Sequence, residues 1–187
     1  ESAKDIENKK FFFPHYPADY TADDIIEIEN KYIEKITYIG DALPKRFINF
    51  GPGSGATYFG SDLKSSVEAN TVWFDPVGKK ISDISLEIQK DCYWYKRIQS
   101  IIDAALKKWK GTVQVSHSDI GGGLDIMAGL RGTQELLFDL YDCPDDVYKF
   151  SRALTKKWLE IYDDETKKIT IKTNFSSKSH SKIKNLS

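Results

Sequence analysis

The chain has 187 residues, of which 40% are hydrophobic and 29% charged, with a formal net charge of −1. This length allows one domain with a sizeable core, and the charge balance excludes an overall field that would attract nucleic acid or an anionic membrane. The longest apolar runs fall far short of the roughly 20 residues that a membrane span needs. Residues 1 to 10 lack the apolar core of a signal peptide, so we expect a cytoplasmic protein.

The two cysteines, Cys92 and Cys143, are too few for a disulfide framework or a cysteine-based metal site. We therefore expect two unpaired thiols in a reducing compartment.

The first predicted helix begins near Thr21. Residues 9 to 17 before it are aromatic and interrupted by prolines, which favours an extended segment. Thr21 and Asp24 have the spacing of a capping box, and apolar residues recur at helical spacing as far as Ile39. Gly40 then ends the predicted helix.

Arg46 to Phe50 predicts a short strand, which is followed by Gly51-Pro-Gly-Ser-Gly55. Three glycines within five residues indicate either close approach of the backbone to a ligand or a tight turn. No Walker lysine follows, and the G-x-G-x-x-G spacing fails at Ala56, so we do not expect a nucleotide-phosphate loop. Residues 56 to 63 are predicted as a short helix.

Two further strands and a long helix are predicted between residues 70 and 110. Asn70 to Phe74 is one strand, and Ile84 to Ile88 alternates apolar and polar residues as a half-buried strand does. Cys92 to Lys110 has apolar residues at helical spacing and lysines in its last turn, with Gly111 just beyond it.

The most informative stretch begins at Val113, where Val113 to Ser116 predicts an apolar strand. A turn at Gly121 to Gly123 and further helices follow, and the last helix opens at Pro144, in the first-turn position that proline prefers. Strands followed by glycine turns and helices indicate an α/β fold, in which ligands bind at the carboxyl ends of strands.

Asp119 and His117, at the end of this strand, are the candidate catalytic residues. Asp119 can orient a cationic or pyrrolic substrate or transfer a proton, or it caps the glycine turn. An imidazole at position 117 suits acid–base chemistry near neutral pH, although a histidine at a strand end is more often structural.

Three more side chains are candidate substrate-binding residues. Asn49 follows the earlier strand and can both donate and accept hydrogen bonds. Arg131 can bind a carboxylate or tie its helix to a neighbour. Asp125 contacts substrate or, as we favour, accepts hydrogen bonds from free N–H groups at a helix start.

The composition changes at Glu165, after which Thr, Ser, Asn and Lys dominate. We therefore predict one domain over residues 1–164 and a basic, mobile tail over residues 165–187. Ile169 to Ile171 is the one segment of the tail that favours a short strand.

Two runs match a known family pattern: Ser118-Asp-Ile-Gly-Gly-Gly-Leu-Asp-Ile-Met-Ala-Gly-Leu-Arg-Gly132 and Leu136-Leu-Phe-Asp-Leu-Tyr-Asp142, the latter followed by Pro144-Asp-Asp-Val147. They resemble the uroporphyrinogen decarboxylase superfamily, which includes the decarboxylase of haem synthesis and cobalamin-dependent methyltransferases. Asn49 to Gly53 and Thr71 to Phe74 resemble the methyltransferase-like branch. The resemblance covers residues 44 to 163.

The resemblance implies a (β/α)8 TIM barrel, and such barrels run to about 250 residues. We therefore expect a partial barrel with about three or four βα units and its later strands missing. It also implies a lyase acting on a tetrapyrrole in porphyrin biosynthesis, or a methyltransferase working with a corrinoid protein. The decarboxylase branch has an arginine-rich N-terminal signature, and here no arginine precedes Arg46.

Methyltransferases of the superfamily bind zinc through His and Cys residues on later strands. His15, His117 and His180 are isolated in the sequence and no His-x-Cys occurs, so we expect no metal and no cofactor in this chain. Zinc or a corrinoid partner is expected only for a longer relative.

The alternative is a catalytically inactive remnant or interaction module. An incomplete barrel has open sheet edges, which another chain can cover by adding a strand. This hypothesis predicts a homodimer or a partner-dependent fold, and neither hypothesis predicts binding to nucleic acid or membrane.

Overall fold

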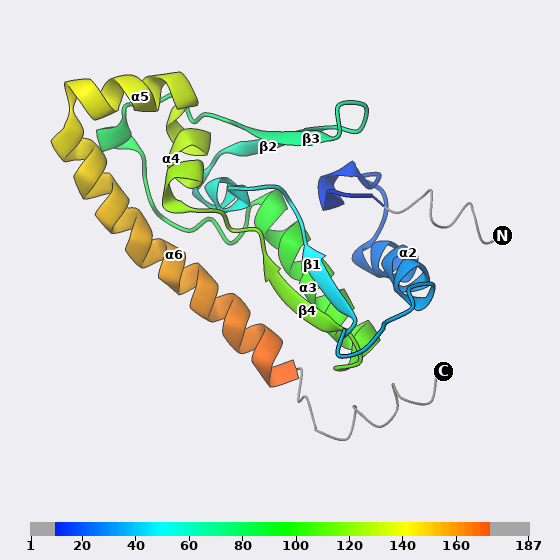
Figure 1. The fold of residues 1–187 in the computed structure, drawn as a ribbon. Helices are drawn as coiled ribbons and strands as arrows, with labels where there is room; N and C mark the ends of the chain where they lie inside the picture. The colour runs from blue at the N-terminus through cyan, green and yellow to red at the C-terminus, as the bar shows by residue number, and fades with distance from the viewer. Residues whose placement is uncertain (1–9, 173–187) are drawn as a thin grey trace.

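The computed structural model describes residues 10 to 172, which form helices and two small sheets, one of them a hairpin that projects at the edge of the molecule (Figure 1). The elements follow in the order η1 (Phe13–His15), α2 (Ala22–Glu34), β1 (Lys45–Ile48), η2 (Ser54–Phe59), β2 (Asp62–Ser66), β3 (Thr71–Asp75), η3 (Ile81–Asp83), α3 (Tyr93–Trp109), β4 (Gln114–Ser118), α4 (Gly123–Arg131), α5 (Thr133–Asp142) and α6 (Pro144–Lys172). Within this range no helix has both the length and the hydropathy of a membrane span.

β1 and β4 form a parallel pair, which confirms both predicted strands and the α/β class. Parallel neighbours need a long crossover, and α3, the last element of that crossover, packs against both strands. Arg46 lies opposite Val115, and after a shift of register Ile48 lies opposite Ser118. The carboxyl ends of both strands therefore lie at one edge of the sheet.

β2 and β3 form a separate antiparallel hairpin in which Asp62 lies opposite Asp75 and Ser66 opposite Thr71. A short turn joins them, and Asn70 in it has a φ of 47°, the left-handed conformation that asparagine tolerates. The prediction of β3 is confirmed, but its pairing is antiparallel because so short a connection cannot join parallel strands.

Two local predictions in this region were wrong in part. Residues 56 to 63 form the end of a 3₁₀ helix and the start of β2, where one helix was predicted. Ile84 to Ile88 has the predicted alternation, since Ile84 is buried and Ser85 and Glu87 are exposed, but it pairs with no strand in the described residues. A period of two reports one buried face and gives no information on a hydrogen-bonded neighbour.

The expected series of about three or four βα units is not found between residues 10 and 172. In that range the strands form one parallel pair and one hairpin, without a closed barrel.

The helices begin where the sequence predicted, but α2 ends at Glu34 and does not continue to Gly40 as predicted, because Ile36 and Ile39 beyond it are exposed and add nothing to its buried face. In α2, Asp24 N–H donates to Thr21 Oγ1 (3.1 Å) and Thr21 N–H donates to Asp24 Oδ2 (2.9 Å), which confirms the capping box. α3 buries Ile98, Ile101 and Ile102 completely and ends at Trp109, with Lys110 as its C-cap.

Helix α6 corrects the predicted boundary of the tail. It continues through Lys172, so residues 165 to 172, including the predicted strand at Ile169 to Ile171, are helical. The buried stripe runs from Leu154 through Ile161 to Glu165, which is 1% exposed. Because a charged residue occupies this buried position, the apolar pattern in the sequence stops before the helix itself ends, and the predicted helix was too short. Residues 173 to 187 of the predicted tail lie outside the described residues.

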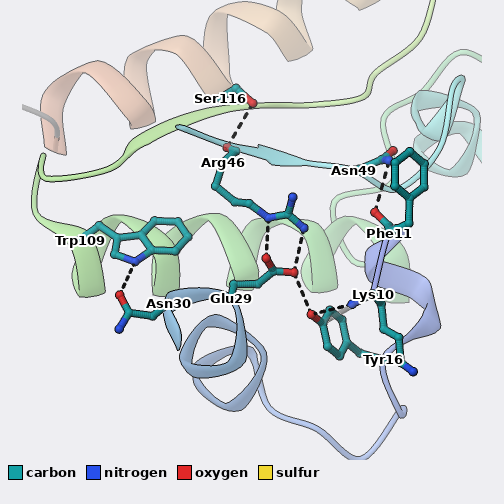
Figure 2. A network of polar contacts seen from close by, with 9 residues as sticks. All are labelled: Lys10, Phe11, Tyr16, Glu29, Asn30, Arg46, Asn49, Trp109 and Ser116. Atoms are coloured by element: carbon teal, nitrogen blue, oxygen red, sulfur yellow. Dashed lines mark hydrogen bonds and ion pairs between the residues drawn. The ribbon is translucent and has the colours of Figure 1, made fainter. Parts of the chain in front are cut away.

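A buried ion pair fixes α2 against β1 (Figure 2). The Arg46 guanidinium contacts both carboxylate oxygens of Glu29, with Nε 2.7 Å from Oε2 and a second nitrogen 2.8 Å from Oε1. Tyr16 O–H donates to the same carboxylate at 2.8 Å, and burial followed by the Glu29 charge raises the pKa of Tyr16. Removing one partner of such a pair leaves the other charge buried, so we expect this contact to be essential for stability.

Candidate functional site

Two glycine loops pack directly on each other at the carboxyl edge of β1 and β4. The first loop is residues 51–55, after β1, and the second is residues 121–123, after β4. Ser54, in the loop after β1, donates both its N–H and its hydroxyl to the carbonyl oxygen of Asp119. Gly121 has a φ of +83°, and a Cβ atom there would lie 2.3 Å from the Cα of Gly53. The close backbone approach predicted from the first loop is therefore an approach to the second loop.

An open cleft of about 330 Å³ lies beside this contact, at the carboxyl end of β4. It is lined by Pro52, His117, Ser118, Asp119, Ile120, Gly121, Gly122, Asp125, Trp158 and Tyr162. Both candidate catalytic residues and one of the three candidate binding residues therefore line the same cleft.

Three stacked rings form one wall of the cleft. The His117 and Tyr162 rings have centroids 4.6 Å apart and are nearly parallel, and the Trp158 ring also stacks on Tyr162, with centroids 5.2 Å apart. Trp158 Nε1 donates to the carbonyl oxygen of Gly121 (2.8 Å), and His117 Nε2 lies 2.8 Å from Thr166 Oγ1. These contacts fix the aromatic side chains of α6 relative to the end of β4.

Two carboxylates, Asp119 and Asp125, also line the cleft. Asp119 is half-buried, and its burial, together with the nearby charge of Asp125, raises its pKa above the ordinary aspartate value. Asp125 accepts a hydrogen bond from Gly122 N–H (3.1 Å), which is the helix-start role favoured from the sequence. Asp119 therefore binds a proton more readily than an exposed aspartate, while Asp125 holds the start of α4.

Asn49 lies outside the cleft, and its polar atoms have structural partners. Its Oδ1 accepts from Gly51 N–H at 3.0 Å, and its Nδ2 donates to the Phe11 carbonyl at 3.4 Å (Figure 2). The side chain is 8% exposed. The structure thus shows Asn49 joining the turn after β1 to the N-terminal segment.

Arg131 also lies outside the cleft. Its guanidinium makes two hydrogen bonds to Asp139 of α5, at 2.6 and 3.1 Å, and this pairing raises the pKa of Arg131. Of the two roles considered for Arg131, the structure shows the link from its helix to a neighbour.

Glu165 is the principal residue of this region that the sequence did not indicate. Its carboxylate accepts from Ser118 N–H (2.9 Å) and Ser118 Oγ (2.8 Å), and more distantly from Gln99 and Tyr58, both at 3.4 Å. Burial and the Glu165 charge raise the pKa of Tyr58 far above its usual value. The spacing of Glu165 from Ile161, one helical turn away, was the available signal.

Within residues 10 to 172, no three His, Cys, Asp or Glu side chains are gathered closely enough to hold a metal ion. Cys92 and Cys143 are both free thiols. Comparisons of the chain with protein-family models, curated proteins and solved structures find no match.

Proposed function

We propose that this chain is part of an enzyme of the uroporphyrinogen decarboxylase superfamily, built as a (β/α)8 barrel, with its substrate in the cleft beside β4. The presence of His117, Asp119 and Asp125 in that one cleft is the main support. The parallel β1–β4 pair with α3 packed against it is the repeating unit expected of such a barrel. Barrel enzymes bind substrates at the carboxyl ends of their strands, where this cleft lies.

The residues lining the cleft favour a flat ligand that presents hydrogen-bond donors or positive charge. They include two carboxylates and three aromatic rings but neither lysine nor arginine. Aromatic faces attract flat or cationic groups, whereas carboxylates repel anions. Of the two activities in the superfamily, this favours corrinoid-dependent methyl transfer, since a corrinoid ring has amide side chains where the decarboxylase substrate has carboxylates.

In this proposal Asp119 and His117 have different roles. The raised pKa of Asp119 increases its protonated fraction, so it can donate as well as accept a hydrogen bond or proton. His117 is held by stacking on Tyr162 and by Thr166, so its imidazole is oriented to exchange hydrogen bonds with a ligand in the cleft.

The test is a binding titration followed by tryptophan fluorescence, with cobinamide as the amide-rich corrinoid probe and uroporphyrin as the carboxylate-rich probe. We expect saturable quenching, with an affinity that Asp119→Asn lowers about tenfold, or about 1.4 kcal/mol. Trp158→Phe should remove most of the signal, and Asp163→Asn, at an exposed carboxylate of α6, should change neither. Absence of saturable binding by both probes, or equal binding by Asp119→Asn, would overturn the proposal.

The second candidate function is an interaction module whose sheet is completed by a second copy of the chain. Phe47 of β1 is 41% exposed although it lies in the parallel pair, and α5 exposes Leu137, Phe138 and Tyr141. A strand from a second copy beside β1 would cover Phe47. This candidate predicts a dimer in sedimentation velocity that Phe47→Ser dissociates, whereas a wild-type monomer that stays folded on dilution rejects it. A cytoplasmic location is part of both proposals.

A further inference from the structure

Glu165 is a buried carboxylate whose four hydrogen-bond donors are all uncharged. The donors are the Ser118 N–H and hydroxyl, the Tyr58 hydroxyl and the Gln99 amide. Burying a carboxylate is unfavourable even when it is hydrogen-bonded. The other buried positions on the same face of α6, such as Leu154 and Ile161, are apolar. An apolar residue would serve helix packing better, so the carboxylate points to a second role.

That role is indicated by where the hydrogen bonds end. The two shortest, at 2.8 and 2.9 Å, both end on Ser118, which lies between His117 and Asp119. The next residue of α6, Thr166, contacts the His117 ring, and the Ser54 hydroxyl donates to the carbonyl oxygen of Asp119. The backbone that carries both candidate catalytic side chains is therefore held in place by α6 and by the first glycine loop.

We propose that Glu165 is a positioning residue: by holding Ser118 it sets the directions in which His117 and Asp119 enter the cleft. This inference rests on the proposed function of the cleft. A carboxylate is required because it accepts from four donors at once, whereas glutamine of the same size turns one oxygen into a donor group. Glu165→Gln therefore keeps the packing and leaves one of the two Ser118 donors facing an NH2 group in place of an acceptor oxygen.

The first readout is independent of any ligand. In the wild-type protein, the His117 ring lies 4.6 Å from Tyr162 and nearly parallel to it, so ring-current effects should shift its C–H proton resonances upfield in NMR spectra. We expect Glu165→Gln to reduce this shift, and Glu160→Gln, at an exposed residue of the same helix, to preserve it. The second readout is the cobinamide affinity, which Glu165→Gln should lower about tenfold in protein shown to be folded.

The outcomes separate the two proposals. An unchanged His117 resonance in Glu165→Gln overturns the positioning role, even if the variant has a lower free energy of unfolding than the wild type. A changed resonance together with no cobinamide or uroporphyrin binding by the wild-type protein overturns the proposed function and leaves the positioning contact standing. If Glu165→Gln does not fold, Ser118→Ala decides the matter, because it removes one donor and should shift the His117 resonance in the same direction. An unchanged resonance in Ser118→Ala would then reject the proposal.

Discussion

The contact between the two glycine loops gives the sharpest test of the geometry beside the cleft. Alanine at position 121 would place its Cβ atom 2.3 Å from both the nitrogen and the Cα of Gly53. Both obstructing atoms belong to the backbone, so no side-chain rotation relieves the clash. The same residue has a φ of +83°, which an alanine adopts only with strain.

The two effects add to a measurable loss of stability. The left-handed conformation costs about 1–2 kcal/mol, and forcing an extra carbon into a packed contact costs about 1–3 kcal/mol. We therefore expect Gly121→Ala to lower the free energy of unfolding by about 3 kcal/mol. Gly123 is the matched control, because an added Cβ meets no atom within 4 Å and the residue starts helix α4. Gly123→Ala should raise stability by up to about 1 kcal/mol.

The assay is urea unfolding followed by circular dichroism and tryptophan fluorescence. The Trp158 indole donates to the Gly121 carbonyl, so a displaced loop should also alter the native emission spectrum of Gly121→Ala. A free energy of unfolding equal to that of the wild type, within about 0.5 kcal/mol, would refute the described packing of the two loops.

Three further predictions concern α2 and Asp119. Glu29→Gln should lower the free energy of unfolding by about 3 kcal/mol, because it leaves the Arg46 charge buried; a loss below about 1 kcal/mol in urea unfolding would contradict this. Thr21→Ala should cost about 1 kcal/mol through loss of the N-cap, and an unchanged urea midpoint would count against the capping box. Because the folded pKa of Asp119 is raised above 3.8, its ionisation destabilises the fold. Asp119→Asn should therefore have a higher free energy of unfolding than the wild type near neutral pH, and this difference should disappear as the pH falls to 3.8. A difference that grows on acidification would contradict the raised pKa.

The sequence predicted the elements whose signals are local. The capping box of Thr21 and Asp24 defined the start of α2, and the apolar period with lysines and Gly111 defined α3. Strand pairing depends on contacts between distant residues, which is why the antiparallel partner of β3 was missed and Ile84 to Ile88 was predicted as a strand. Periodicity reports burial, and burial alone does not identify the neighbour.

The candidate site was predicted in part for the same reason. His117, Asp119 and Asp125 are close in sequence to one strand end, and all three line the cleft. Trp158 has the spacing of a core residue, and its position in the cleft wall depends on how α6 crosses β4. Glu165 was assigned to a tail because a charge at a buried helical position interrupts the apolar pattern.

Hydrogen–deuterium exchange with and without cobinamide or uroporphyrin tests most directly whether the cleft beside β4 is the ligand site. The backbone amides of residues 117–125 and of 158–166 belong to the two segments, one around the end of β4 and one in α6, whose side chains line or support that cleft. We predict that a bound probe slows exchange in both segments together and leaves α2 unchanged. Protection confined to other segments, such as β1 around Phe47, or no protection with either probe, would contradict the assignment of this cleft as the functional site.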